Sequence, residues 1–325
     1  MNALLSVREL RVEFGTSGGV VTAVDGASFD VGAGETVALL GESGSGKSVT
    51  AQAVLGIVPK PAGRVAGGSV RYDGQDLLAP GVAKGLRGRE IAMVFQDPLS
   101  SLNPVFRVGA QIGEMFRRHR GASRREARAA ALELMKRVGI PAASKRLDDY
   151  PHQFSGGMRQ RVMIAMALAL SPRLLIADEP TTALDVTVQA QIMQLLTRLQ
   201  SEEGMSLVLI THDLGVVADV ADRVVLMYAG RVVETGPLRE VYEHSRHPYT
   251  SGLMASIPVL DGPRERLTPI QGSPPDLLSL PSGCSFRPRC RYADALCADV
   301  RPELAGPADH QTACHHPEGA LADVR

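Results

Sequence analysis

The sequence predicts an α/β fold with a largely parallel sheet, and three observations support this fold class. Apolar strand-like segments alternate with helical ones, as in "RLLIADEP", a helical pattern over residues 186–203, and then "SLVLITHD". A glycine-rich turn, "GESGSGKS", joins an apolar strand over residues 36–40 to a helix. Regular alternation of strands and helices is typical of a parallel sheet.

Composition and charge indicate a globular protein and argue against a membrane-spanning or secreted one. With 325 residues, 44% of them hydrophobic, the chain can bury a substantial core. Its 35 basic and 35 acidic residues balance, so net charge does not point to nucleic acid or to an anionic membrane. The N-terminus lacks a basic start followed by an apolar run, and a secretory signal is therefore not expected. The longest apolar run, Val162–Leu170, is too short for a spanning helix, which needs about 20 residues. We expect a cytoplasmic protein that acts at a membrane only through partners.

The first part of the chain is predicted to be rich in strands. Residues 4–40 carry β-branched and apolar residues in alternation with polar ones, broken by Gly and Asp. "GSVRYDGQDL" predicts a further strand and turn, and "REIAMVFQDP" predicts a short buried strand that ends at Pro98.

The middle of the chain is predicted to be helical. From residue 105 to about residue 149 the apolar residues follow helical spacing, with Ser123 as an N-cap and Gly139 as a stop. Residues 156–170 predict a mostly apolar helix. The basic run at residues 117–128 is interpreted as a solvated helix face, because no aromatic residues that could stack on bases are interleaved.

A domain boundary is predicted near residue 250. After Pro248, proline, glycine and serine become frequent and the periodicity fades. We therefore expect one domain over residues 1–250, with a helical subdomain over about 97–160, and an extension over 251–325.

Residues Gly41 to Ser48 fit the phosphate-loop pattern G-x-x-x-x-G-K-[ST] between a strand and a helix, a context that disfavours a chance Gly/Ser loop. The glycines let backbone N–H groups turn toward phosphate oxygens, and the helix adds its positive dipole end. Lys47 is expected to reach the β- and γ-phosphates, and the Ser48 hydroxyl to bind Mg²⁺. The predicted nucleotide-binding residues of this loop are Gly41, Ser43, Gly44, Ser45, Gly46, Lys47, Ser48 and Val49.

Two adjacent carboxylates, Asp178 and Glu179, end the apolar segment "LLIADEP". Asp178 is expected to hold Mg²⁺ through water, because that ion keeps much of its hydration shell. Glu179 is expected to lie next to the γ-phosphate and to accept a proton from the attacking water. An acidic strand-to-loop cap is the alternative, and it is the weaker one after a phosphate loop.

Together with "QFSGGMRQR", "TTALD" and "THD", these motifs make residues 1–250 resemble the nucleotide-binding subunit of an ABC transporter. The resemblance implies a P-loop (RecA-like) ABC ATPase core with an antiparallel β subdomain and a helical subdomain, here followed by a small cysteine-rich extension. It also implies two cassettes packed head to tail around two ATP molecules, with each signature loop binding the γ-phosphate of the partner's ATP. The matching signature-loop residues are Ser155, Gly156, Gly157, Met158 and Gln160.

The signature loop of that family usually reads LSGGQ, so Phe154 and Met158 depart from it. Met158 loses a polar contact that nearby Gln160 could supply. A helix that starts at the two glycines would offer free N–H groups and a positive dipole end to an anion.

Four further residues take their roles from the resemblance alone. Gln96 in "VFQDP" matches the Q-loop residue that senses Mg²⁺ and the attacking water, and Asp185 matches the D-loop residue at the dimer interface. His212 matches the switch histidine that contacts the γ-phosphate, and Phe14 the aromatic residue that stacks on adenine. The predicted catalytic residues are thus Glu179, His212 and Gln96, and the predicted Mg²⁺ ligands are Ser48, Gln96 and Asp178.

The segments "VFQDPLSSLNPVFRVGAQI", "HPYT" and "IQGSPPDL" resemble dipeptide/oligopeptide permease ATPase subunits in particular. This implies an ATPase that powers peptide uptake at the cytoplasmic face of the membrane. Its partners would be a second, different ATPase subunit, two permease subunits and an extracytoplasmic solute-binding protein, with no nucleic acid. Import of nickel, haem or another solute is an alternative. A soluble ABC ATPase that acts on ribosomes or nucleic acid is disfavoured by the single cassette, and an ATP-binding regulator is disfavoured by the intact Glu179.

All four cysteines, Cys284, Cys290, Cys297 and Cys314, lie in the extension, with the spacing C-x₅-C-x₆-C-x₁₆-C. Disulfides are disfavoured in a reducing cytoplasm. Zinc is an alternative, although these gaps exceed the usual C-x₂₋₄-C, and free thiols are another. A [4Fe–4S] cluster fits four thiolates with variable spacing, and the resembled subunits often carry such a tail. The alternative metal ligands are His310, His315 and His316, and the arginines expected to surround Cys290 are Arg287, Arg289 and Arg291.

Overall fold

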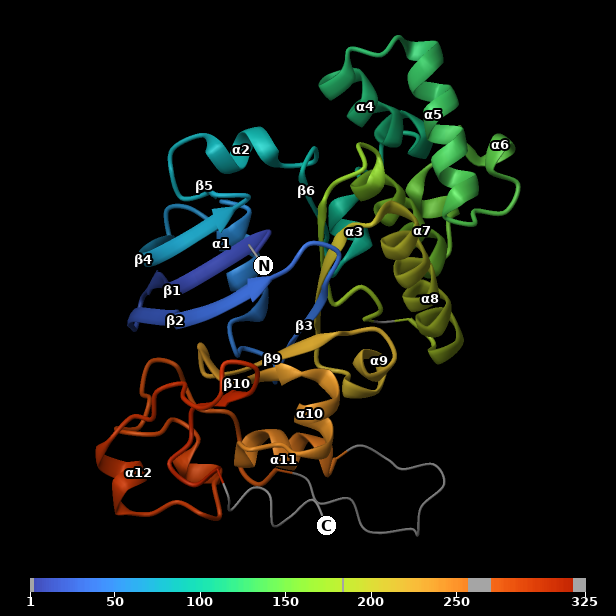
Figure 1. The fold of residues 1–325 in the computed structure, drawn as a ribbon. Helices are drawn as coiled ribbons and strands as arrows, with labels where there is room; N and C mark the ends of the chain where they lie inside the picture. The colour runs from blue at the N-terminus through green and yellow to red at the C-terminus, as the bar shows by residue number, and fades with distance from the viewer. Residues whose placement is uncertain (1–2, 183, 257–269, 318–325) are drawn as a thin grey trace. The chain divides into compact units, whose positions relative to one another are not determined.

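The computed structural model describes residues 3–182, 184–256 and 270–317 (Figure 1). The chain forms two compact units. The first unit is built from Met1–Val31, Thr36–Leu78 and Thr211–Arg325. The second unit is built from Gly32–Glu35 and Ala79–Ile210. In the predicted extension, residues 257–269 and 318–325 lie outside the described residues.

The first unit contains an antiparallel sheet with the strand order β2-β1-β4-β5. Alternation along its first strand buries Val7, Leu10 and Val12 completely, which is the pattern of a strand with one face toward a core. The strands predicted within residues 4–40 are therefore confirmed. The strands of this sheet are β1 (Leu5–Thr16), β2 (Gly19–Val31), β4 (Gly63–Tyr72) and β5 (Gln75–Asp76).

A second set of strands in this unit carries the phosphate loop. β3 (Thr36–Leu40), buried at every position, pairs in parallel with β9 (Arg223–Tyr228). β10 (Arg231–Pro237) is antiparallel to β9, and the short β11 (Gln311–Thr312) is antiparallel to β10. The helices of this unit are α1 (Lys47–Val54), α9 (Leu214–Ala218), α10 (Leu238–Glu243), α11 (Pro248–Met254), α12 (Ala295–Asp299) and the 3₁₀ turn η2 (Arg287–Arg289).

The second unit contains three parallel strands that read as continuous apolar runs. β7 (Leu174–Asp178) pairs in parallel with β6 (Ile91–Val94) and with β8 (Ser206–Thr211), whose last residue belongs to the first unit. All five positions of β7 are buried, as expected for a parallel strand covered on both faces. The predicted parallel pairing is confirmed within each unit.

Helices make up most of the second unit (Figure 1). Ser123 caps its helix in a capping box with Glu126, and the helix ends at Arg137, two residues before Gly139. The helices are α2 (Val82–Leu86), α3 (Pro98–Ser101), α4 (Val108–Arg120), α5 (Arg124–Arg137), α6 (Ala143–Arg146), the 3₁₀ turn η1 (Pro151–Gln153), α7 (Gly156–Leu168) and α8 (Val186–Glu203). Across the described ranges, no helix has the length and apolarity that crossing a membrane requires.

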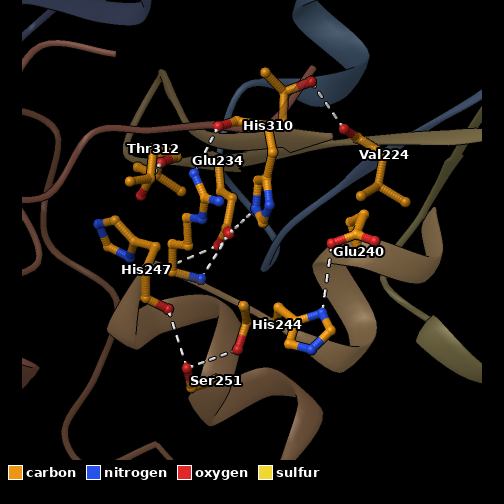
Figure 2. A network of polar contacts seen from close by, with 12 residues as sticks. Val224, Glu234, Glu240, His244, His247, Ser251, His310 and Thr312 are labelled. Atoms are coloured by element: carbon orange, nitrogen blue, oxygen red, sulfur yellow. Dashed lines mark hydrogen bonds and ion pairs between the residues drawn. The ribbon is translucent and has the colours of Figure 1, made fainter. Parts of the chain in front are cut away.

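A buried carboxylate on β10, that of Glu234, forms hydrogen bonds with residues of the C-terminal part of the first unit (Figure 2). Glu234 is fully buried and accepts hydrogen bonds from the backbone N–H groups of Arg246 (2.7 Å) and His247 (3.0 Å). Its Oε1 also lies 2.7 Å from Nε2 of His310, which immediately precedes β11. One side chain therefore joins β10 to the start of α11 and to the end of the extension.

We predict that Glu234→Ala lowers the free energy of unfolding by about 3 kcal/mol, because it leaves two buried N–H groups and a buried imidazole without their acceptor. Glu240→Ala is the matched control, since Glu240 pairs with His244 at 3.4 Å where both side chains are more than half exposed. Its cost should stay below about 0.5 kcal/mol. Urea denaturation of both variants tests this, and equal midpoints would contradict the anchoring role of Glu234.

Candidate functional site

The predicted phosphate loop has a defined conformation between β3 and α1. Lys47 is 4% exposed, and its Nζ donates to the carbonyl oxygens of Gly41 (2.7 Å) and Glu42 (2.9 Å). The Ser45 carbonyl accepts a hydrogen bond from the N–H of Gly230, which follows β9. The loop is thus closed on itself by its lysine and tied to a neighbouring turn.

Two glycines of this loop occupy positions that no other residue can fill without displacing backbone. Gly41 has φ +147°, and an added Cβ would lie 2.2 Å from the Met227 carbonyl oxygen. Gly46, at φ +101°, would place a Cβ 2.5 Å from the Ala23 carbonyl oxygen. The motif glycines are therefore required by close backbone approach as well as by their positive φ.

The remaining predicted residues of the first unit lie at the ends of its elements. Ser48 and Val49 are half-buried in the first turn of α1, and Ser43 and Gly44 are exposed. Phe14 lies on β1 with its ring against Gly63, where an added Cβ would come within 2.6 Å of Phe14 Cε1.

His212 is exposed directly after β8, and its neighbours fix the turn that carries it. The Thr211 hydroxyl accepts a hydrogen bond from the Asp213 N–H. The Asp213 carboxylate in turn caps α9 by accepting from the N–H groups of Gly215 and Val216.

In the second unit, Glu179 and Gln96 are brought together. Gln96 Nε2 donates to Glu179 Oε2 at 3.0 Å, and the Thr182 hydroxyl donates to the same oxygen at 2.7 Å. These bonds orient the carboxylate and commit the amide nitrogen of Gln96, so its amide oxygen is the atom available to a cation. Thr182 was missed at the sequence level, although the "TT" after Pro180 was a signal for a hydroxyl near Glu179.

The backbone of Glu179 is held in an unfavourable conformation. Its φ is +44°, which a residue with a side chain rarely adopts, and its N–H donates to the Ile210 carbonyl on β8. Asp178, one position earlier at the tip of β7, is 4% exposed. A backbone outlier at a strand tip beside a buried carboxylate is typical of a functional site.

The signature-loop residues lie at the N-terminus of α7, as predicted. Ser155 is the N-cap, and Gly157 packs so closely on α8 that an added Cβ would lie 2.6 Å from Val188 Cγ1. Phe154 is buried, which explains why an apolar residue is accepted there. Gln160, however, is 2% exposed, so in this structure it does not supply the surface contact that Met158 lacks.

Asp185 is exposed and has a structural role of its own. It is the N-cap of α8, and its carboxylate accepts a hydrogen bond from the Val188 N–H at 2.9 Å. The capping role orders the start of α8 next to the signature loop.

The four cysteines converge on one small cavity in the first unit, and none forms a disulfide. The enclosed space is about 10 Å³, room for one water-sized body or a single ion. His315 and His316 also line the cavity, as does His247, which sequence reasoning missed. His310 does not, because its Nε2 is committed to Glu234.

Burial raises the pKa of all four thiols, that of Cys314 to about 12. The thiols are therefore protonated at neutral pH unless a cation replaces the protons. Ligand atoms of Asp294, Cys297 and His316 lie within 4.8 Å of one another, a spacing that suits one ion.

The arginines around Cys290 have separate partners. Arg287 lines the cavity, and Arg291 lies over the Tyr292 ring. Arg289 instead forms a bidentate ion pair with Glu42 of the phosphate loop, at 2.6 and 2.9 Å. This pair raises the pKa of Arg289 further. The expectation that Arg289 surrounds Cys290 is wrong, because Glu42 takes both of its terminal nitrogens and Arg289 does not line the cysteine cavity.

The chain matches two family models in the regions that carry its motifs. The family model "ABC transporter" matches residues 24–182, and the model "Oligopeptide/dipeptide transporter, C-terminal region" matches residues 233–297. The dipeptide transport ATP-binding protein DppD of Bacillus subtilis (strain 168) is 50% identical over 314 residues, covering 96% of this chain and 94% of that protein. The oligopeptide transport ATP-binding protein OppD of the same organism is 51% identical over 304 residues, covering 93% of this chain and 85% of that protein.

A solved structure is similar as well. It is a dimeric post-hydrolysis state of the ATP-binding cassette MJ0796 bound to ADP and phosphate, with 30% identity and a TM-score of 0.65. The match covers 72% of this chain and 99% of that chain.

We predict that Gly46→Ala destabilises the protein by about 3 kcal/mol, because the new methyl group collides with the Ala23 carbonyl in addition to the strain at positive φ. Gly44→Ala is the matched control: its φ is +79°, but nothing lies within 4 Å of an added Cβ. Its cost should be about 1 kcal/mol, from the backbone alone. Denaturation midpoints distinguish the two, and equal shifts would contradict the packing argument.

Proposed function

This chain belongs to the ABC transporter family, in its oligopeptide/dipeptide branch, and from that membership we propose how its residues drive peptide import. It is the ATP-hydrolysing subunit of a peptide importer, and its relatives are named as transport ATP-binding proteins for dipeptides and oligopeptides. The observation that carries the mechanism is the carboxylate of Glu179, which is oriented by Gln96 and Thr182 at the tip of a buried strand.

We propose that the 41–48 loop binds the phosphates of ATP. Its backbone N–H groups and the Lys47 ammonium would neutralise phosphate charge, and Phe14 would stack on the adenine. The side chains that would hold Mg²⁺ are Ser48, Gln96 and Asp178, a set of hard oxygen donors that fits this ion. Mg²⁺ when bound supplies charge stabilisation to the phosphates.

The hydrolytic step is assigned to Glu179. Its carboxylate accepts a proton from water while the water oxygen bonds to the γ-phosphorus. The bond from that phosphorus to the β–γ bridging oxygen breaks, and ADP leaves. Gln96 and Thr182 keep Glu179 Oε2 in place, and His212 contacts the γ-phosphate in this proposal.

Family membership and the dimeric relative support a pair of ATPase subunits that work with permease subunits. We propose further that the second ATPase subunit is a different chain and that an extracytoplasmic binding protein delivers the peptide. In this assembly the 155–158 loop and Asp185 of one subunit meet the ATP of the other. The chain would then lie at the cytoplasmic face of the membrane, held there by the permeases.

We also propose that Cys284, Cys290, Cys297 and Cys314 bind a [4Fe–4S] cluster. Convergence of four thiols on one cavity, without a disulfide, supports a metal centre. The thiols would be its ligands, and they would have to move apart to admit it, because the cavity of about 10 Å³ has room for only a single ion. The cluster would stabilise a segment that has little apolar core of its own. Zinc, bound by Asp294, Cys297 and His316, is the second candidate, favoured by their compact spacing and by the small cavity.

We predict that Glu179→Gln lowers steady-state ATPase turnover by about 10²-fold, because an amide cannot accept the proton from water. ATP binding, measured with a fluorescent analogue, should stay within about twofold of the parent protein. Glu133→Gln is the control, since Glu133 is an exposed helix residue paired with Lys136. Unchanged turnover in the Glu179 variant would show that another group is the base.

We predict that anaerobically purified full-length protein contains iron and sulfide and absorbs at about 400 nm. Cys290→Ser and Cys314→Ser should lose both signals, while the neighbouring Ser285→Ala should keep them. Zinc without iron would contradict the cluster, and the absence of both metals would leave the cysteines as free thiols.

A further inference from the structure

The first variable residue of the phosphate loop, Glu42, is held by two residues from the C-terminal part of the first unit. Its backbone N–H donates to the Tyr249 hydroxyl at 2.8 Å, and its carboxylate receives both terminal nitrogens of Arg289. The Glu42 carbonyl meanwhile accepts from Lys47 Nζ. All three polar groups of Glu42 are therefore used to fix the start of the loop.

The Arg289 side chain is also held in place by contacts other than its ion pair with Glu42. Its side chain is 5% exposed, and its Nε donates to the Gln271 carbonyl at 2.9 Å. The guanidinium carbon lies 5.8 Å from the ring centre of Tyr228 and 5.9 Å from that of Phe286. The two rings contact each other, with centroids 5.2 Å apart, and the guanidinium packs against both. A planar guanidinium held in this way loses little further freedom when it binds a carboxylate.

The ion pair between Glu42 and Arg289 neutralises a negative charge in the loop that we propose binds phosphate. Glu42 places a carboxylate one residue from Gly41, in a loop that would receive several negative charges. An uncompensated carboxylate there would repel the nucleotide. The bidentate pair cancels that charge and fixes the side chain on Arg289.

We propose that Arg289 is a positioning residue for ATP binding, through which the C-terminal extension sets the affinity of the phosphate loop. The inference rests on the proposed role of the 41–48 loop in binding ATP. Arg289 acts through Glu42 and does not itself touch the nucleotide. Because it lies between Cys284 and Cys290, the fold of the cysteine segment bears directly on the loop.

The test measures binding of Mg²⁺ and a fluorescent ATP analogue to the full-length chain. We expect Arg289→Ala to raise the Kd about tenfold, because Glu42 loses both its restraint and its counter-charge. Arg289→Lys should be intermediate, since it keeps the charge without the two-pronged geometry. In steady-state ATPase assays, Arg289→Ala should raise KM by a similar factor with kcat within about twofold of the parent.

The matched control is Arg301→Ala. Arg301 is also an extension arginine paired with a first-unit carboxylate, Asp25 on β2, at 2.7 Å. Its loss should change the Kd less than about twofold, because that pair is half-exposed and does not involve the phosphate loop.

A double variant shows whether Arg289→Ala weakens binding through Glu42 or by damaging the fold. Glu42→Gln combined with Arg289→Ala removes both charges and should bring the Kd back to within about threefold of the parent. The inference is overturned if Arg289→Ala binds as tightly as Arg301→Ala, or if the double variant is no better than Arg289→Ala. Lys47→Ala tests the proposed function separately from the role of Arg289. If this variant still binds ATP normally, the 41–48 loop does not bind ATP, and the proposed function fails rather than the positioning role.

Discussion

Close approach of backbone to backbone at Gly41 and Gly46 is the constraint on which the first unit depends. The Met227 and Ala23 carbonyls lie where any Cβ would have to be, so the loop cannot relax away from its neighbours. Lys47 then closes the loop by bonding to the carbonyls of residues 41 and 42. A loop that is fixed before its ligand arrives spends little binding energy on ordering, which suits a site that must bind ATP repeatedly.

The second unit positions its carboxylates by a different means. β7 is buried throughout, and the chain turns sharply at its end with a positive φ at Glu179. The strained backbone directs this side chain to Gln96 and Thr182, which hold the same carboxylate oxygen. Strain of this kind persists only where the surrounding structure determines it, here through the hydrogen bond from Glu179 N–H to β8.

Within the first unit, the residues that follow α11 are joined to the rest by buried polar contacts. Glu234 anchors His310, and Glu42 anchors Arg289, each by a carboxylate that is at least three-quarters buried. His310, an alternative metal ligand in the sequence analysis, and Arg289, expected beside Cys290, thus pair with carboxylates instead. Arg289 and His310 both lie within the stretch of chain from Cys284 to Cys314, so the segment that lines the cysteine cavity also contacts the phosphate loop.

The motifs and the elements that carry them follow from the order of residues along the chain. Alternation of apolar and polar residues predicted β1 and β2, and continuous apolar runs predicted β7 and β8. Ser123 and Gly139 predicted the ends of α5 to within two residues. These signals can be found in the sequence because they depend only on residues that are neighbours in the chain. Which distant groups meet depends on how the elements pack in three dimensions. The pairing of Arg289 with Glu42, 247 positions apart, and the commitment of His310 to Glu234 leave no local pattern. Burial of Gln160 could not be predicted either, because the helix period alone does not say which polar side chain faces inward.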